Sequence, residues 1–173
     1  MRLDPVRTPA TATDLLVFPR KTQVRRREGW LEVCTPGNPG FQSGNGVVLL
    51  APPVEGELAA WRARWQEAFA DRPGIQQERY EWELSGAPDE DRIQAARWRE
   101  AEAAGFEMEW LAVLRLEAGR AAVPDASPHS LRPLETDADW TSHVAMLVSV
   151  FGQGAEFLRW HHDAYRDRVE RGE

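Results

Sequence analysis

Residues 44–69, GNGVVLLAPPVEGELAAWRARWQEAF, constrain the fold more than any other stretch of the sequence. A turn signal precedes a continuous run of Val and Leu, which is typical of a strand covered on both faces. Pro52 and Pro53 end that run, and Trp and Phe then recur at helical spacing. The sequence therefore predicts a buried strand, a short loop and a helix over about residues 57–70.

The loop between that strand and that helix is a candidate anion site. The first N–H groups of a helix have no partner within the helix, so they can hold a phosphate. Here each of the two prolines lacks an N–H, and Glu55 and Glu57 add negative charge. We therefore expect this loop to bind a phosphate poorly.

Strand and helix patterns alternate along the chain around this stretch. The further elements expected from periodicity are strands at residues 30–35, 79–84 and 106–116 and a helix at residues 89–104. The helix predicted at residues 89–104 begins with three acidic residues and stops at Gly105. The order strand, helix, strand, helix, strand predicts parallel neighbours. The expected fold class is α/β, with a mixed central sheet and helices on both faces.

The sequence divides into two parts at a segment with little hydrophobic content. Residues 121–130 are expected to form a linker after a first domain at residues 14–120. Residues 131–173 predict one short strand and two amphipathic helices, whose apolar stripes cannot all be buried within the pair. Thr136 and Asp139 resemble a capping box with Asp in place of Glu.

Composition excludes several classes of function. The net charge of −7 provides no general attraction for nucleic acid, and the run Arg25–Arg27 is expected to be a solvated turn or strand edge. The single cysteine, Cys34, is expected to be a small buried or half-buried side chain rather than a nucleophile. No apolar run approaches the roughly 20 residues that a membrane span needs, and no hydrophobic secretory core is present. We therefore expect a cytoplasmic protein without a membrane partner.

Few residues carry a recognisable chemical pattern. The consecutive His161 and His162 diverge on a helix and cannot chelate one metal ion together, so no metal site is expected. Glu81 and Glu83 share one face of a predicted strand. They can be read as an acid and base pair or, more simply, as a solvated face.

Two groups of residues form longer motifs. The first group consists of Asn38, Pro39, Gly44, Asn45, Leu49, Pro52, Pro53, Leu58 and Trp61, and the second of Leu131, Arg132, Pro133, Leu134, Asp139 and Trp140. Together with the order of elements, they resemble a bacterial subgroup of the GNAT superfamily, the GCN-five-related N-acetyltransferases. In that subgroup the second motif opens another acetyltransferase half.

The resemblance implies an acyl-CoA N-acyltransferase-like fold, with a degenerate GNAT-like first domain and the beginning of a second unit. Acetyl-CoA would be the cofactor of an active member, held near Val54, Gly56 and Leu58, and Glu81 or Glu83 would take the proton of the amine. The loop departs from the [QR]-x-x-G-x-[GA] form of the family. The expectation is therefore that N-acyl transfer is lost or incomplete in this chain.

Two other functions remain open from the sequence. The first is a non-catalytic interaction module that forms a homo-oligomer or packs against a partner acetyltransferase domain, through an exposed stripe of Leu158, Tyr165 and Val169. The second is a small-ligand site lined by Trp61, Trp82 and Trp110, although core packing explains these residues with fewer assumptions.

Overall fold

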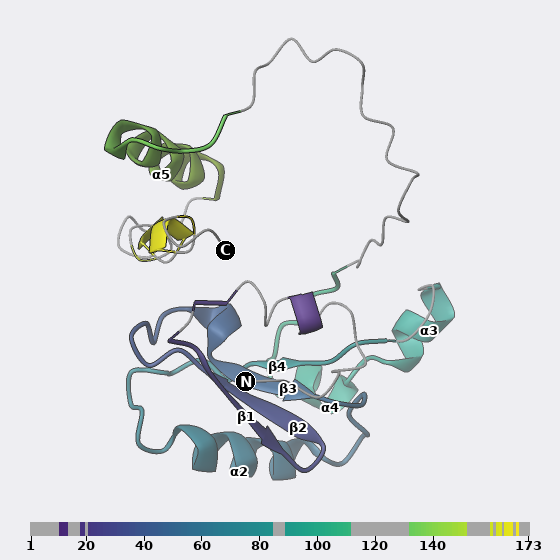
Figure 1. Cartoon of the computed structure of the whole chain (residues 1–173). Coiled ribbons are helices and arrows are strands. Elements are labelled where there is room, and N and C mark those ends of the chain that lie inside the picture. Colours follow the sequence, from purple (N-terminus) through teal and green to yellow (C-terminus); the bar gives the residue numbers. More distant parts are fainter. Residues whose placement is uncertain are drawn as a thin grey trace. The chain divides into compact units, whose positions relative to one another are not determined.

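The computed structural model describes residues 11–13, 18–19, 21–84, 89–111 and 132–151, and residues 160, 162, 163, 165–167 and 169. The chain forms two compact units, Met1–Val113 and Leu114–Glu173 (Figure 1). The predicted linker at residues 121–130 lies outside the described residues, as do residues 14–17 and 112–116.

A four-stranded mixed sheet organises the first unit (Figure 1). Its strands are β1 (Gln23–Arg27), β2 (Trp30–Cys34), β3 (Gly46–Leu49) and β4 (Tyr80–Glu81). The spatial order is β1-β2-β3-β4; the first two pairings are antiparallel, and β3 pairs with β4 in parallel. Helix α2 (Leu58–Phe69) connects the parallel pair. The predicted α/β class with a mixed sheet is thus confirmed. The strand predicted at residues 79–84 is only two residues long.

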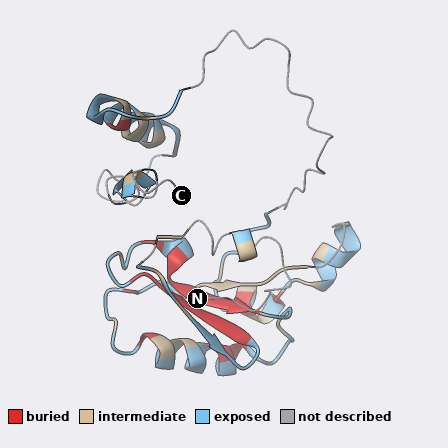
Figure 2. Cartoon of the chain, viewed as in Figure 1, coloured by how far each residue is buried: buried red, intermediate tan, exposed pale blue. Residues whose placement is uncertain are grey.

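Strands β2 and β3 are buried along their whole length (Figure 2). Trp30 and Cys34 of β2 contribute to one hydrophobic cluster. Leu31 and Val33 pack on the opposite face with Val48 of β3. The prediction of a strand covered on both faces is confirmed for residues 46–49, because successive side chains of an extended chain point to opposite faces.

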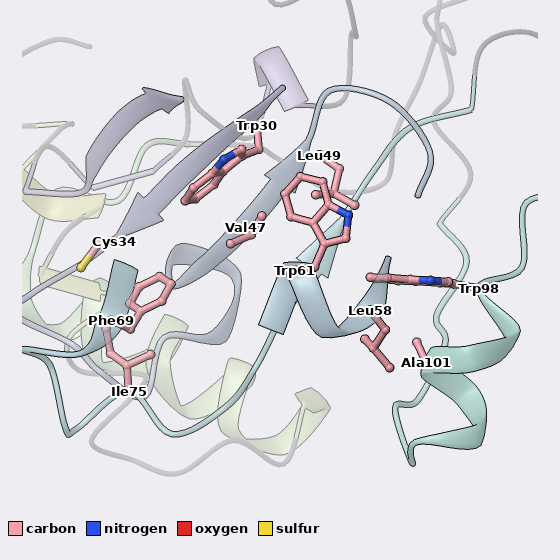
Figure 3. Close-up of a cluster of buried hydrophobic side chains, with 10 residues drawn as sticks. All are labelled: Trp30, Cys34, Val47, Leu49, Leu58, Trp61, Phe69, Ile75, Trp98 and Ala101. Atoms are coloured by element: carbon pink, nitrogen blue, oxygen red, sulfur yellow. The ribbon is translucent and has the colours of Figure 1, made fainter. Parts of the chain in front are cut away.

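Helix α2 packs against one face of the sheet and supplies much of the main core (Figure 3). That core consists of Trp30, Cys34, Val47, Leu49, Leu58, Trp61, Phe69, Ile75, Trp98 and Ala101. The rings of Trp30 and Trp61 meet edge to face with their centroids 6.4 Å apart. Trp65 and Ala68 pack at the margin of the same core. The predicted apolar stripe of this helix is therefore the face that is buried.

The helix predicted at residues 89–104 is broken into α3 (Glu90–Ala95) and α4 (Arg99–Ala103). Trp98, only 2% exposed, lies at the break, and its ring packs against Tyr80 and Trp82. Interruption of the helix lets this large ring enter the core, and its burial outweighs the lost helical hydrogen bonds. The predicted ends are correct. Asp89 accepts a hydrogen bond from the N–H of Arg92 at 2.8 Å, and Gly105 has a φ of +91°.

The long strand predicted at residues 106–116 is not found in the part that the structure describes, residues 106–111. Phe106 packs against Tyr80 with ring centroids 5.8 Å apart, but Trp110 is 41% exposed and Leu111 is more exposed still. The alternation of apolar and polar residues in the sequence indicates which side chains can turn inward. A strand also requires a neighbour to share its hydrogen bonds, and alternation does not provide one.

The second unit contains α5 (Asp137–Phe151). Residues 132–135, where a short strand was expected, are irregular. Trp140 of α5 is buried, and its ring contacts those of His143 and His162. Leu158 lies outside the described residues, whereas Tyr165 and Val169 are exposed. None of the helices that the structure describes is both long and apolar enough to span a membrane.

Candidate functional site

The loop between β3 and α2 has the geometry of an anion site, and a carboxylate of the chain itself occupies it. Gly56 adopts a φ of +94°, which glycine tolerates better than other residues. The backbone N–H groups of Gly56 and Leu58 both donate to Oε1 of Glu100, at 2.8 and 2.9 Å. These are N–H groups that a bound phosphate would use at a helix start. Glu100 therefore takes the place of an external anion.

A further donor holds Glu100 in place. The indole Nε1 of Trp98 donates to the same Oε1 atom at 2.7 Å. Burial by itself would raise the pKa of Glu100. The hydrogen bonds from Trp98 and from the backbone of Leu58, Gly56 and Glu57 outweigh that effect and lower the pKa below its usual value. Glu100 is thus a carboxylate anion at neutral pH.

Glu55 makes the reciprocal contact with α4. Its carboxylate accepts hydrogen bonds from the backbone N–H groups of Arg99 and Glu100, at 2.7 and 3.2 Å. The α2 loop thus caps the start of α4, while Glu100 of α4 caps the start of α2. We call the two contacts the crossed caps. They close the loop against another part of the chain and leave its N–H donors engaged.

Glu57 also accepts hydrogen bonds within the loop. Its Oε2 atom receives the backbone N–H of Val54 at 3.1 Å and the indole N–H of Trp61 at 3.3 Å. The backbone N–H groups of Val54, Gly56 and Leu58, the candidate cofactor residues, therefore all donate to glutamates of the chain. The sequence showed that Glu55 and Glu57 disfavour a phosphate. It did not show that Glu55 and Glu100 serve as internal acceptors, because the crossed caps join residues more than 40 positions apart. The acceptor role of Glu57 is local, but it was not predicted from the sequence.

The candidate acid and base residues, Glu81 and Glu83, have partners of their own. Glu81 lies in β4 opposite Val48, and its carboxylate accepts a hydrogen bond from Arg79 at 3.0 Å. Glu83 accepts a hydrogen bond from the backbone N–H of Thr11. Both residues are half-buried. The face that carries them is thus partly exposed, and the two carboxylates are used in ion pairing and in tying down an N-terminal segment.

The three tryptophans considered as a ligand site do not form one aromatic group. Trp61 packs on Trp30 in the main core, Trp82 packs on Trp98, and Trp110 is 41% exposed. Core packing is the role of Trp61, and Trp82 packs at the edge of the same core.

Glu32 is a buried charge that the sequence did not reveal. Its side chain is 1% exposed and lies within 3.3 Å of Arg25, 2.9 Å of Arg27 and 3.4 Å of Arg72. Arg25 is directly opposite Glu32 in the β1–β2 pairing. Two residues of the arginine run are thus half-exposed at the strand edge, as expected, but they also neutralise a buried carboxylate. Cys34 at the end of β2 is fully buried, which confirms the expected burial, and that burial raises the pKa of its thiol.

The first motif behind the family resemblance has a structural explanation. Asn45 is buried, and its side-chain Oδ1 accepts the N–H of Thr35 while Nδ2 donates to the carbonyls of Asn38 and Phe41, each at 2.8 Å. A Cβ atom on Gly44 would lie 2.5 Å or less from the ring of Phe41 and the hydroxyl of Thr35. This part of the motif therefore shapes the connection between β2 and β3.

Among the described residues, no group of three or more His, Cys, Asp or Glu side chains is placed to hold a metal ion. Comparison of the chain with models of known protein families, with curated proteins and with solved structures found no match.

Proposed function

We propose that this chain is a GNAT-like protein, with the acyl-CoA N-acyltransferase type of fold and helices on both faces of its sheet, in which N-acyl transfer has been lost. The proposal is supported by the parallel β3–β4 pair joined by α2, which matches the order of elements in that family. The observation that carries the loss of activity is Glu100, which accepts the N–H groups of Gly56 and Leu58.

An incoming pyrophosphate would have to displace Glu100 from these donors. It would also approach Glu55 and Glu57, whose negative charges oppose an anion. The protein would gain no new donors in return, because Pro52 and Pro53 have no N–H. On these grounds acetyl-CoA is not a resident cofactor of this chain.

Calorimetric titration with acetyl-CoA tests the proposal. We expect no saturable heat from the native protein at millimolar ligand, and saturable binding would contradict the loss of activity. Replacement Glu100→Ala frees the two N–H groups and should give weak but measurable binding of inorganic pyrophosphate. The matched control is Glu67→Ala on an exposed position of α2, which should gain nothing. Equal behaviour of the two variants would show that Glu100 is not the blocking group.

The second candidate function is a non-catalytic interaction module, and α5 provides the observation that favours it. Met146 and Val150, one helical turn apart, are 50% and 65% exposed. Exposed apolar side chains that form a patch often mark a protein interface. Light scattering after size exclusion should then show self-association that Met146→Glu abolishes and Ser142→Glu, at an exposed polar position of the same helix, does not. A strict monomer at high concentration would exclude self-association.

A further inference from the structure

An open cavity of about 430 Å³ lies away from the crossed caps. Arg62 and Trp65 line it from α2, Gln76 and Glu78 from the segment that leads into β4, and residues 104–106 from the end of α4. Its volume falls within the range of small-ligand sites. It shares no residue with the loop of Val54 to Leu58, so a ligand here would not depend on that loop.

Two aromatic rings form part of the wall. Trp65 and Phe106 both line the cavity, and the guanidinium of Arg62 lies 6.0 Å from the centre of the Phe106 ring. Flat π-systems favour contact with other aromatic rings and with guanidinium groups. Because the cavity is open, it suits a flat molecule that stacks on one wall better than a compact one that must be enclosed.

The polar part of the wall offers both donors and acceptors. Nε of Arg62 pairs with Glu78 at 3.0 Å, which leaves the terminal guanidinium nitrogens as donors toward other groups. The carboxylate of Glu78 has further acceptor positions, and the amide of Gln76 can both donate and accept. An isolated anion would meet the charge of Glu78, and an isolated cation would meet that of Arg62. A neutral ring with alternating donors and acceptors fits this wall.

Unused polar atoms lie in or next to the same wall. The indole Nε1 of Trp65 and the hydroxyl of Tyr80 are buried and have no hydrogen-bond partner among the described residues. The ring of Tyr80 packs against Phe106, and burial followed by the charge of Glu78 raises the pKa of its hydroxyl, which stays protonated. Buried donors without partners are uncommon in folded proteins. Because both atoms are buried, the polar contacts of a ligand in the open cavity fall to Arg62, Gln76 and Glu78.

We propose that this cavity binds a neutral planar heterocycle of the oxopurine type, in which a ring carbonyl stands beside a ring N–H. The carbonyl accepts from Arg62 or Gln76, the ring N–H donates to Glu78, and the ring stacks on Trp65 or Phe106. The inference does not rest on the proposed function, because it uses none of the residues of the α2 loop.

Inosine and adenosine provide a matched pair of probes, since adenosine lacks the carbonyl and the adjacent ring N–H. Nitrogen–proton correlation spectra of the whole chain follow the indole signal of Trp65, which is assigned from its disappearance in Trp65→Phe, and the amide signal of Phe106. Inosine should shift both signals to saturation. Adenosine should bind at least about tenfold more weakly, the difference expected from one lost charge-assisted hydrogen bond.

Variants of the polar wall distinguish hydrogen bonding to the edge of the ligand ring from stacking on its face. Glu78→Gln should weaken inosine binding about tenfold, whereas the control Glu67→Gln, exposed on α2, should bind as the native protein does. Dispersed spectra of both variants establish that they are folded. The variant Arg62→Gln provides a second test of the contacts to the polar edge of the ligand ring. The proposal is overturned if inosine shifts neither signal to saturation, if adenosine binds equally well, or if Glu78→Gln binds with native affinity.

Discussion

Helices α2 and α5 both begin at a carboxylate cap, but the two carboxylates come from very different places in the chain. At α5 the cap is local: Asp139 accepts the N–H of Thr136 at 2.9 Å, and the hydroxyl of Thr136 accepts the N–H of Asp139 at 3.2 Å. At α2 the cap is Glu100, which follows Leu58 by 42 residues. A local cap stabilises its own helix. A remote cap also makes the start of one helix depend on the position of another.

The partners that hold the two capping carboxylates in place also differ in their distance along the chain. Arg132 pairs with Asp139, and this hydrogen bond, followed by those from Thr136, lowers the pKa of Asp139 well below its usual range. All three residues lie within eight positions of one another. Glu100 instead depends on the burial of Trp98 in the core. Loss of tertiary packing should therefore release the cap of α2 while leaving that of α5 intact.

The largest effect on this comparison is expected from Trp98→Ala. Removal of a buried tryptophan should lower the free energy of unfolding of the first unit by about 3 to 5 kcal/mol, and it also removes a donor to Glu100. Urea unfolding gives the stability, and hydrogen exchange at the amide of Leu58 reports the cap. The control Trp110→Ala, at a position that is 41% exposed, should cost clearly less than Trp98→Ala. Equal losses for the two variants would show that Trp98 does not anchor this region.

A smaller loss is expected from Glu100→Gln, and its pH dependence gives the sharper test. Because folding lowers the pKa of Glu100, its contribution to stability is complete above the ordinary glutamate pKa of about 4.3 and is lost as the pH falls through the folded-state value. The variant should therefore be less stable than the native protein at neutral pH, and the difference should shrink on acidification. Urea midpoints at several pH values measure it. A difference that is independent of pH would contradict an ionised cap.

The smallest effects are expected when single caps are removed. Glu55→Ala and Thr136→Ala should each lower the free energy of unfolding by about 1 kcal/mol, as is usual for a helix cap. The two variants should differ in which backbone amides exchange faster. Glu55→Ala should speed hydrogen exchange at the amides of Arg99 and Leu58 alike, since the crossed caps join both helices, whereas Thr136→Ala should affect only the start of α5. If Glu55→Ala left the amide of Leu58 unchanged, the two caps would be independent.

The same distinction explains how much could be predicted from sequence. Strands β2 and β3, the buried face of α2 and the capping box depend on residues only a few positions apart, and all were predicted correctly. The sequence also predicted a helix start near Asp89, but not the cap that the Asp89 side chain provides. The break at Trp98, the crossed caps and the arginine cluster around Glu32 depend on contacts between distant segments, which periodicity does not encode. The strand expected at residues 106–116 was wrong over residues 106–111 for a related reason, because its alternating pattern cannot specify a pairing partner.

Asn45 has a consequence for the chemical ageing of the protein. It precedes Gly46, and Asn-Gly sequences are prone to deamidation. The glycine nitrogen attacks the asparagine side-chain carbonyl and expels ammonia, and water then opens the cyclic imide to aspartate or isoaspartate. Here the hydrogen bonds to Thr35, Asn38 and Phe41 restrain that side chain, and cyclisation would have to break them. Deamidation at this position therefore requires the β2–β3 connection to open. The aspartate and isoaspartate that accumulate at residue 45 in stored protein are a chemical record of how often this connection opens.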